Sequence, residues 1–150
     1  MTSFHETLRK KRTEVGMDES RAGFLLGLSS NEYYDLENHA DEWKTATPLY
    51  VVLFACRLFG IDLMKFVPAQ AGIAVHQVGC AGDIIKEQRT QMGLSGPDFA
   101  DRCGFTEQFT SVVETGDGLL IYPLDVACIV CQVLGLDVAS FVSKILRPTT

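Results

Sequence analysis

The chain has 150 residues, 47% hydrophobic and 21% charged, a composition typical of globular proteins and unlike that of disordered or fibrous ones. Its formal net charge of −6 repels nucleic acid at long range, so DNA binding requires a local basic patch. No apolar run reaches the roughly 18 residues of a membrane span, and the N-terminus lacks signal-peptide features, so we expect a cytoplasmic protein without membrane contact.

Helix signals recur along the whole chain. Ser29 to Glu32 has the form of a capping box, Ser95 precedes an early proline, and Gly60 and Gly135 stand where a glycine ends an apolar helix. The apolar spacing between these signals favours helices over strands. The predicted helices cover residues 4–15, 18–26, 29–38, 48–59, 62–67, 81–92, 95–103, 106–115, 123–134 and 137–146.

The chain contains an internal repeat. Arg12-Thr13 recurs as Arg89-Thr90, and further matches pair Gly16 with Gly93, Gly27 with Gly104, Glu37 with Glu114, Cys56 with Cys131 and Phe66-Val67 with Phe141-Val142. The repeat predicts an all-α protein with two five-helix domains, over 1–67 and 81–147, joined by a linker over 68–80. In each copy the second and third helices meet at a tight glycine turn, which is the helix-turn-helix plan.

The order of these positions resembles the helix-turn-helix domains of the Cro and phage-repressor type, the Xre family. The second copy carries the pattern most plainly, in Gly93-Leu94-Ser95, Phe99-Ala100, Gly104-Phe105-Thr106 and Val113-Glu114. The resemblance implies a repressor-like fold and a regulator of transcription that binds double-stranded operator DNA. It also implies that Ser29 to Glu37 and Thr106 to Glu114 are recognition helices, which enter the major groove.

Two sets of residues follow as candidates for DNA contact. The base-contact candidates are Asn31, Tyr34, Gln108 and Ser111, and the phosphate-contact candidates are Arg9, Lys10, Lys11, Arg12 and Arg89. Neither recognition segment contains a lysine or arginine, and both carry net negative charge. The alternative is that Asn31 and Gln108 are solvated or capping residues, and that Arg12 and Arg89 hold an intradomain carboxylate such as Glu37 or Glu114.

A second hypothesis treats the chain as a helix-turn-helix scaffold that acts by protein–protein interaction, as an anti-regulator, co-regulator or antitoxin-like protein. Its partner would be a regulator, a polymerase subunit or a toxin, and the pattern also leaves a homodimer open. The interface candidates are Tyr33, Tyr34, Phe109 and Val112, if the recognition helices expose them. In another helix phase Phe109 and one of the two tyrosines belong to the core.

Motifs for catalysis are absent from the sequence, so we expect neither an enzyme nor a cofactor. The five cysteines are odd in number and we expect a cytoplasmic chain, so we expect reduced thiols and not a disulfide framework. Cys128 and Cys131 form a Cys-x-x-Cys that could bind zinc with Cys56 and Cys103. Because this pair lies within an apolar helix, we instead expect the four thiols to be small buried hydrophobes and no metal to be bound.

Overall fold

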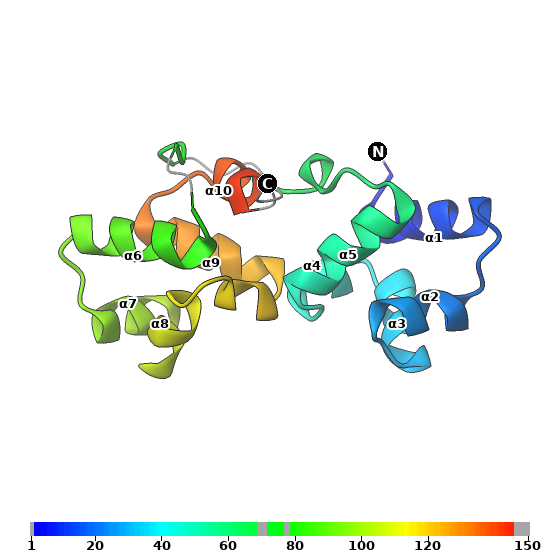
Figure 1. The fold of residues 1–150 in the computed structure, drawn as a ribbon, viewed down its shortest axis with the longest axis horizontal. Helices are drawn as coiled ribbons and strands as arrows, with labels where there is room; N and C mark the ends of the chain where they lie inside the picture. Colours follow the sequence, from blue (N-terminus) through cyan, green and yellow to red (C-terminus); the bar gives the residue numbers. More distant parts are fainter. Residues whose placement is uncertain (1, 69–71, 77–78, 146–150) are drawn as a thin grey trace. The chain divides into compact units, whose positions relative to one another are not determined.

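The computed structural model describes residues 2–68, 72–76 and 79–145, and its regular elements in these ranges are helices (Figure 1). The predicted all-α class is therefore confirmed. The chain divides into two compact units. Unit 1 comprises Met1–Phe66 and Tyr122–Leu124, and unit 2 comprises Val67–Ile121 and Asp125–Thr150.

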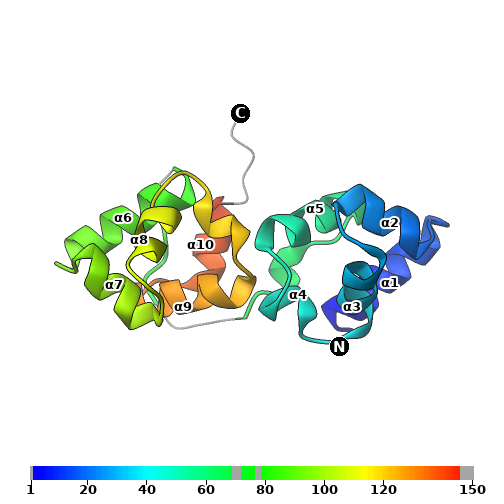
Figure 2. The ribbon, with the colours of Figure 1, turned by 90° about the horizontal axis from the view of Figure 1, so that it is seen from below.

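Unit 1 is built on α2 and α3, which lie against each other, and on α1, which contacts both α3 and α5 (Figures 1 and 2). The sequence places apolar residues almost all round α5, but the helix buries one face only, because Tyr50 and Phe54 on the other face are more than half exposed. Trp43 of α4 stacks on Phe4, with ring centroids 4.8 Å apart, and closes one end of the core. The elements are α1 (Phe4–Glu14), α2 (Glu19–Leu26), α3 (Ser30–Asn38), α4 (Glu42–Thr45), α5 (Leu49–Phe59) and the 3-10 helix η1 (Leu63–Lys65).

Unit 2 has a similar order of elements, in which α7 contacts α8 and α6 lies against α8 and η2 (Figures 1 and 2). Gly82 allows α6 to approach the turn after α8, because a Cβ atom at this residue would lie 2.6 Å from the Glu114 carbonyl oxygen. The elements are α6 (Ala81–Gln91), α7 (Gly96–Cys103), α8 (Gln108–Val113), the 3-10 helix η2 (Gly118–Ile121), α9 (Leu124–Leu134) and α10 (Val138–Ile145).

Most predicted helices have observed counterparts whose ends differ by one or two residues. The helix predicted over 62–67 is reduced to η1, and α8 starts at Gln108 instead of 106. The N–H groups of Phe109 and Thr110 bond to the carbonyls three residues back, so residues 106–107 form a tighter turn before the α-helix. Short α4 and η2 were not predicted. Residue 146 of the last predicted helix and residue 147 of the predicted second domain lie outside the described ranges.

The predicted linker contains a segment that binds to unit 2. The backbone N–H of Ile73 donates to the Gly135 carbonyl at 2.8 Å, and the Asp137 N–H donates to the Ile73 carbonyl at 2.9 Å. These bonds form an isolated parallel bridge between Ile73 and Leu136. Residues 72–76 are thus an extended part of unit 2, while residues 69–71 and 77–78 of the predicted linker lie outside the described ranges.

Candidate nucleic-acid interface

The turn between α2 and α3 is tightly built. The helix α2 ends at Gly27, which has a left-handed φ of +73°, and the Leu28 N–H then returns to the Gly23 carbonyl at 2.8 Å. Gly23 also lets α3 approach α2, since a Cβ atom there would lie 3.2 Å from the Cβ of Tyr33. Ser29 and Glu32 form the predicted capping box, and α3 begins directly after this turn.

The helix α3 presents a polar face and buries an apolar one. Asn31 and Tyr34, the two base-contact candidates of the first copy, are exposed one turn apart on this helix. Tyr33 and Leu36 are fully buried. The hydroxyl of Tyr33 has no hydrogen-bond partner among the described residues, and burial raises the pKa of this phenol. Tyr33 is therefore a core residue and not an exposed interface residue, whereas Tyr34 remains available for contact.

The guanidinium of Arg12 is held inside unit 1 by the fully buried Glu37. Its Nε donates to Oε2 at 2.7 Å and its Nη2 donates to Oε1 at 2.8 Å, while Nη1 donates to the Met17 carbonyl at 2.7 Å. Desolvation is the largest single influence and would raise the pKa of Glu37, but the combined effect of the neighbouring groups, above all the hydrogen bonds and charge of Arg12, outweighs it, and the pKa lies below its ordinary value. The sequence allowed two roles for Arg12, a phosphate contact or an internal ion pair, and the structure shows the internal ion pair.

The other cations of the α1 run are more accessible. Arg9 is exposed, yet its guanidinium hydrogen bonds to the Glu37 carboxylate, the Glu37 carbonyl and the side chain of Asn38. Lys10 is exposed and Lys11 half-buried, and the structure gives neither an ion pair among the described residues. Of the phosphate-contact candidates, Lys10 and Lys11 are therefore the two whose charges are not directed into unit 1.

Unit 2 repeats the local arrangement with different exposed residues. The helix α7 starts at the N-cap Ser95 and ends at Gly104, where φ is +84°. In α8 the base-contact candidates Gln108 and Ser111 are exposed, and the Ser111 hydroxyl donates to the Gln108 carbonyl at 3.0 Å. The side chain of Ser111 therefore already has a partner within its own helix.

The two interface candidates of α8 are not freely exposed. Phe109 is buried and stacks on Phe105, with ring centroids 4.2 Å apart, and Val112 is half-buried. The core interpretation of Phe109 is therefore the one that the structure supports. The helix phase explains this result, because Phe109 lies one turn before the buried Val113 on the same face.

Arg89 forms the equivalent internal pair in unit 2. Its Nε donates to Glu114 at 2.5 Å and its Nη2 at 3.0 Å, and its Nη1 donates to the Leu94 carbonyl at 2.8 Å. The hydrogen bonds that Arg89 donates to the Glu114 carboxylate raise the pKa of this guanidinium. The pair joins α6 to the end of α8, so Arg89, like Arg12, contributes to the interior of its unit.

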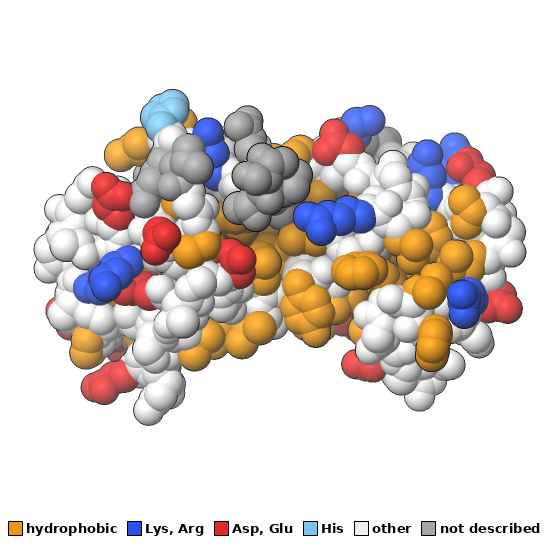
Figure 3. All heavy atoms as spheres, in the orientation of Figure 1, with side chains coloured by type: hydrophobic (Ala, Val, Ile, Leu, Met, Phe, Trp, Pro, Cys, Tyr) orange, Lys and Arg blue, Asp and Glu red, His pale blue; other side chains and the backbone are white. Residues whose placement is uncertain are grey.

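The surfaces around both predicted recognition helices are not basic. Asp18, Glu19 and Glu32 are exposed near the starts of α2 and α3, and Glu107 precedes α8. On the face drawn in Figure 3, lysine and arginine side chains are scattered and do not form one continuous stripe. The local cations of α1 must therefore act against acidic neighbours in any contact with phosphate.

A solvent-facing aromatic side chain on α2 was not predicted. Phe24 is 74% exposed, and the guanidinium of Arg21 lies 5.9 Å from its ring centroid. The spacing of residues along α2 could have predicted this exposure, because Ala22, Gly23 and Leu26 lie on the buried face and Phe24 falls on the opposite one. Unit 1 also exposes Tyr50 and Phe54 on α5.

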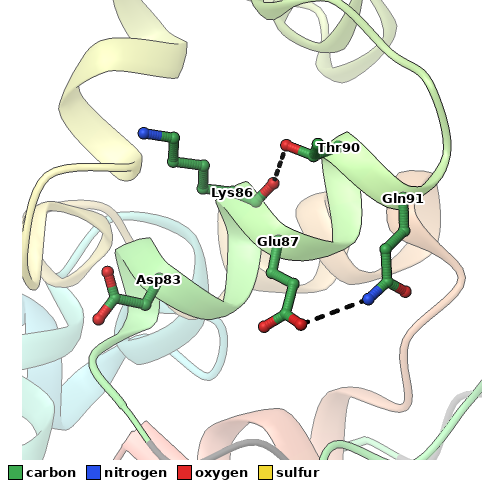
Figure 4. Close-up of a pocket in the computed structure, with 5 residues that line it drawn as sticks. All are labelled: Asp83, Lys86, Glu87, Thr90 and Gln91. Carbon is green, nitrogen blue, oxygen red and sulfur yellow. Dashed lines mark hydrogen bonds between the residues drawn. The ribbon is translucent and has the colours of Figure 1, made fainter.

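Other candidate sites are weak. A shallow polar hollow of about 410 Å³ runs along α6 and is lined by Asp83, Lys86, Glu87, Thr90 and Gln91 (Figure 4). Its dashed contacts stay within the helix, from Thr90 to the Lys86 carbonyl and from Gln91 to Glu87. No group of three His, Cys, Asp or Glu side chains that could hold a metal occurs in the described ranges.

The cysteines are free thiols in the structure. Four of them are buried, as expected of small core residues: Cys56, Cys103, Cys128 and Cys131. Burial raises the pKa of Cys103 to about 11 and that of Cys56 to about 12, which disfavours the thiolate that metal binding needs.

Comparison with known proteins gives no relative for this chain: no family model, curated protein or solved structure matches it. Within the described residues, none of the helices has the length and apolar character needed to cross a membrane. The function must therefore be argued from the residues themselves.

Proposed function

We propose that this chain is a regulator of transcription that binds operator DNA, the activity implied by its resemblance to the Xre family. Two repressor-like units, each with five main helices, would form the tandem pair that the internal repeat predicts. The matching pairs Arg12–Glu37 and Arg89–Glu114 support this view, because each joins the first helix of a unit to the end of the third. Each arginine also donates to the carbonyl five residues further along the chain.

The observation that carries the proposal is the exposed start of α3. A tight turn at Gly27 and a capped first turn present Asn31 and Tyr34 to solvent, while the apolar residues of α3 face inward. An asparagine amide can pair with the N6 and N7 atoms of adenine, and a tyrosine hydroxyl can contact phosphate or a base edge. Lys10 and Lys11 lie on α1, which contacts α3, and supply positive charge within the same unit. We therefore assign the main contact to unit 1.

The test is titration of the purified chain into labelled duplex from the promoter of its own gene and into an unrelated duplex of equal length. We expect sequence-dependent binding that weakens between about 50 and about 200 mM salt, because cations that contact phosphate release counterions. Asn31→Ala is expected to weaken specific binding by about 1–3 kcal/mol and to reduce the preference for the cognate duplex.

Charge variants separate phosphate contact from base contact. The double variant Lys10→Glu/Lys11→Glu should weaken binding to both duplexes, whereas Lys86→Glu, which removes an exposed cation from unit 2, should leave unit 1 binding largely intact. Absence of binding by the unaltered chain at low salt, to the promoter as well as to the unrelated duplex, would refute the proposal.

A second candidate function, binding of a protein partner, is favoured by the exposed Phe24. A large aromatic ring that faces solvent beside a cation is typical of interface residues. The partner would be a regulator, a polymerase subunit or a toxin, contacted through Phe24 and Tyr34. Calorimetric titration with purified RNA polymerase subunits tests one of these classes, and Phe24→Ser should abolish the heat of binding while Gln108→Ala should not.

A further inference from the structure

The turn between α9 and α10 binds an extended segment of its own chain. The Ile73 N–H donates a hydrogen bond to the Gly135 carbonyl, and the Ile73 carbonyl accepts one from the Asp137 N–H. Two residues further along, the Val75 N–H donates to the Ser140 hydroxyl at 2.9 Å, and the Val75 side chain is only 5% exposed. The backbone of residues 72–76 is thus held by three hydrogen bonds and one buried side chain.

The bound segment needs a glycine at its start. A Cβ atom on Gly72 would overlap the backbone of Leu136 and the N–H of Asp137, so only a residue without a side chain fits. The next residue is less constrained, because the Ile73 side chain is 66% exposed. Recognition therefore depends on a glycine and on extended backbone, which are the features of pairing with an exposed strand edge.

Unit 1 contains the same turn after α5. Gly60 ends α5 with a φ of +68°, and Gly135 ends α9 with a φ of +69°. In both turns the following N–H returns to the carbonyl of the cysteine in the last helical turn, at 2.8 Å. The aspartates that come next, Asp62 and Asp137, each accept a hydrogen bond from a backbone N–H at the start of the following helix.

In this second turn, the backbone groups equivalent to those that bind Ile73 have no partner among the residues that the structure describes. Gly60 and Asp62 are exposed, and the structure gives no hydrogen-bond partner, within the described ranges, to the Gly60 carbonyl or the Asp62 N–H. We propose that the turn at Gly60–Asp62 of unit 1 is a docking site for an extended segment of a partner protein, bound by the pair of backbone hydrogen bonds that holds Ile73 in unit 2.

Lys65 adds a charge preference to this site. In the internal repeat Lys65 stands where unit 2 has Ser140, the residue that binds the backbone of the docked segment. Lys65 is exposed, so its ammonium group favours a carboxylate beside the third residue after the glycine, at the position of the exposed His76. Because the template buries Val75 and exposes Ile73, the partner segment is of the type glycine, any residue, any residue, apolar residue, acidic residue.

The experiment uses the full ¹⁵N-labelled chain and an acetylated, amidated peptide of sequence Gly-Ile-Ala-Val-Asp. We expect the amide resonances of Asp62 and its neighbours to shift, and the shifts to saturate at millimolar peptide concentrations. The template segment in unit 2 is held at the millimolar effective concentration of a short tether, so a free peptide should need a similar concentration. A peptide with alanine in place of glycine should produce no shift. Lys65→Glu should lower the affinity for the peptide by about two- to fivefold, as expected for the loss of an exposed ion pair.

Two results would overturn the proposal. One is the absence of shifts at Asp62 up to about 10 mM peptide, well above the effective concentration expected of a tether. The other is a set of shifts confined to Gly135–Asp137, which would mean that the peptide only displaces the chain's own segment. The variant Gly72→Ala is the control: it should release that segment and increase the hydrogen exchange of the Asp137 amide. An unchanged exchange rate there would remove the template for the site and overturn the proposal as well.

Discussion

The buried pair of Arg12 and Glu37 gives the sharpest test of the fold. The change is Glu37→Ala, which removes both carboxylate oxygens that receive the Arg12 guanidinium at 2.7 and 2.8 Å. The Met17 carbonyl and the more distant Glu19, at 3.7 Å, then remain as partners of a charge on an almost fully buried side chain. Breaking a buried ion pair in this way costs about 3–5 kcal/mol.

A loss of this size is a large part of the stability of a small domain, which is about 5–15 kcal/mol for whole proteins and lower for short ones. With a urea m-value of about 1–1.5 kcal/mol per molar, the unfolding midpoint should fall by roughly 2–5 M. Glu37→Gln keeps the shape of the side chain and one acceptor oxygen, so its midpoint should lie between those of Glu37→Ala and the unaltered chain.

Trp43 allows the change to be followed in unit 1. It is the one tryptophan of the chain, it is buried, and it stacks on Phe4 in the core of unit 1. Its fluorescence during urea titration therefore reports the unfolding of that unit. The matched control is Glu114→Ala, which breaks the equivalent pair of unit 2 and should lower the helical circular dichroism transition more than the Trp43 transition.

The lowered pKa of Glu37 predicts that the stability of unit 1 depends on pH. The pKa of Glu37 lies below its ordinary value of 4.5, so below that pH the unfolded chain takes up a proton that the folded chain does not. The contribution of the pair is therefore complete above pH 4.5 and is lost as the pH falls through the lowered pKa. Glu37→Gln should remove this part of the acid dependence. If Glu37→Ala lowers the free energy of unfolding by less than about 1 kcal/mol, the reasoning is refuted, because an exposed ion pair already contributes that much.

Three further predictions concern caps, close packing and thiols. Ser29→Ala should lower the stability of unit 1 by about 1 kcal/mol in the Trp43 assay, and Ser30→Ala, beside it but outside the capping box, should not. Gly82→Ala should cost unit 2 about 1–3 kcal/mol by circular dichroism, because its Cβ would lie 2.6 Å from a carbonyl oxygen; an unchanged transition would show that the turn moves freely. Cys56 and Cys103 should react slowly with a thiol reagent at pH 8 until urea is added, since burial raises both pKa values, and rapid labelling of the native chain would contradict their burial.

The helices could be predicted from sequence where periodicity and local signals agree. The capping box at Ser29 and the glycines after α5 and α9 mark helix ends by backbone chemistry that acts within a few residues. The short α4 could not be predicted in this way, because four residues give no periodicity and Trp43 is held in place by Phe4 and Phe66 from distant parts of the chain.

The candidate site was predicted less completely than the helices. Residue type singled out Asn31 and Tyr34 as base-contact candidates, and the helix phase, which the sequence left open for the two tyrosines, exposes both. Residue type could not decide whether Arg12 faces solvent or Glu37, since the choice depends on how α1 packs on α3. The sequence also could not decide whether Phe109 is exposed or buried, and in the structure it is buried and stacks on Phe105. The docking of residues 72–76 had no sequence signal except Gly72, because it rests on backbone hydrogen bonds that any residue can make.

The two internal arginine–glutamate pairs have a consequence for how freely the surface can vary. Each pair secures the first and third helices of its unit without using an exposed side chain of α3 or α8. We therefore expect the exposed positions of these helices to tolerate change without loss of the scaffold; they hold Asn31 and Tyr34 in one unit and Gln108 and Ser111 in the other. A library of substitutions confined to those four positions should yield mostly folded proteins, so new binding specificities could be selected in either unit on a scaffold that stays constant.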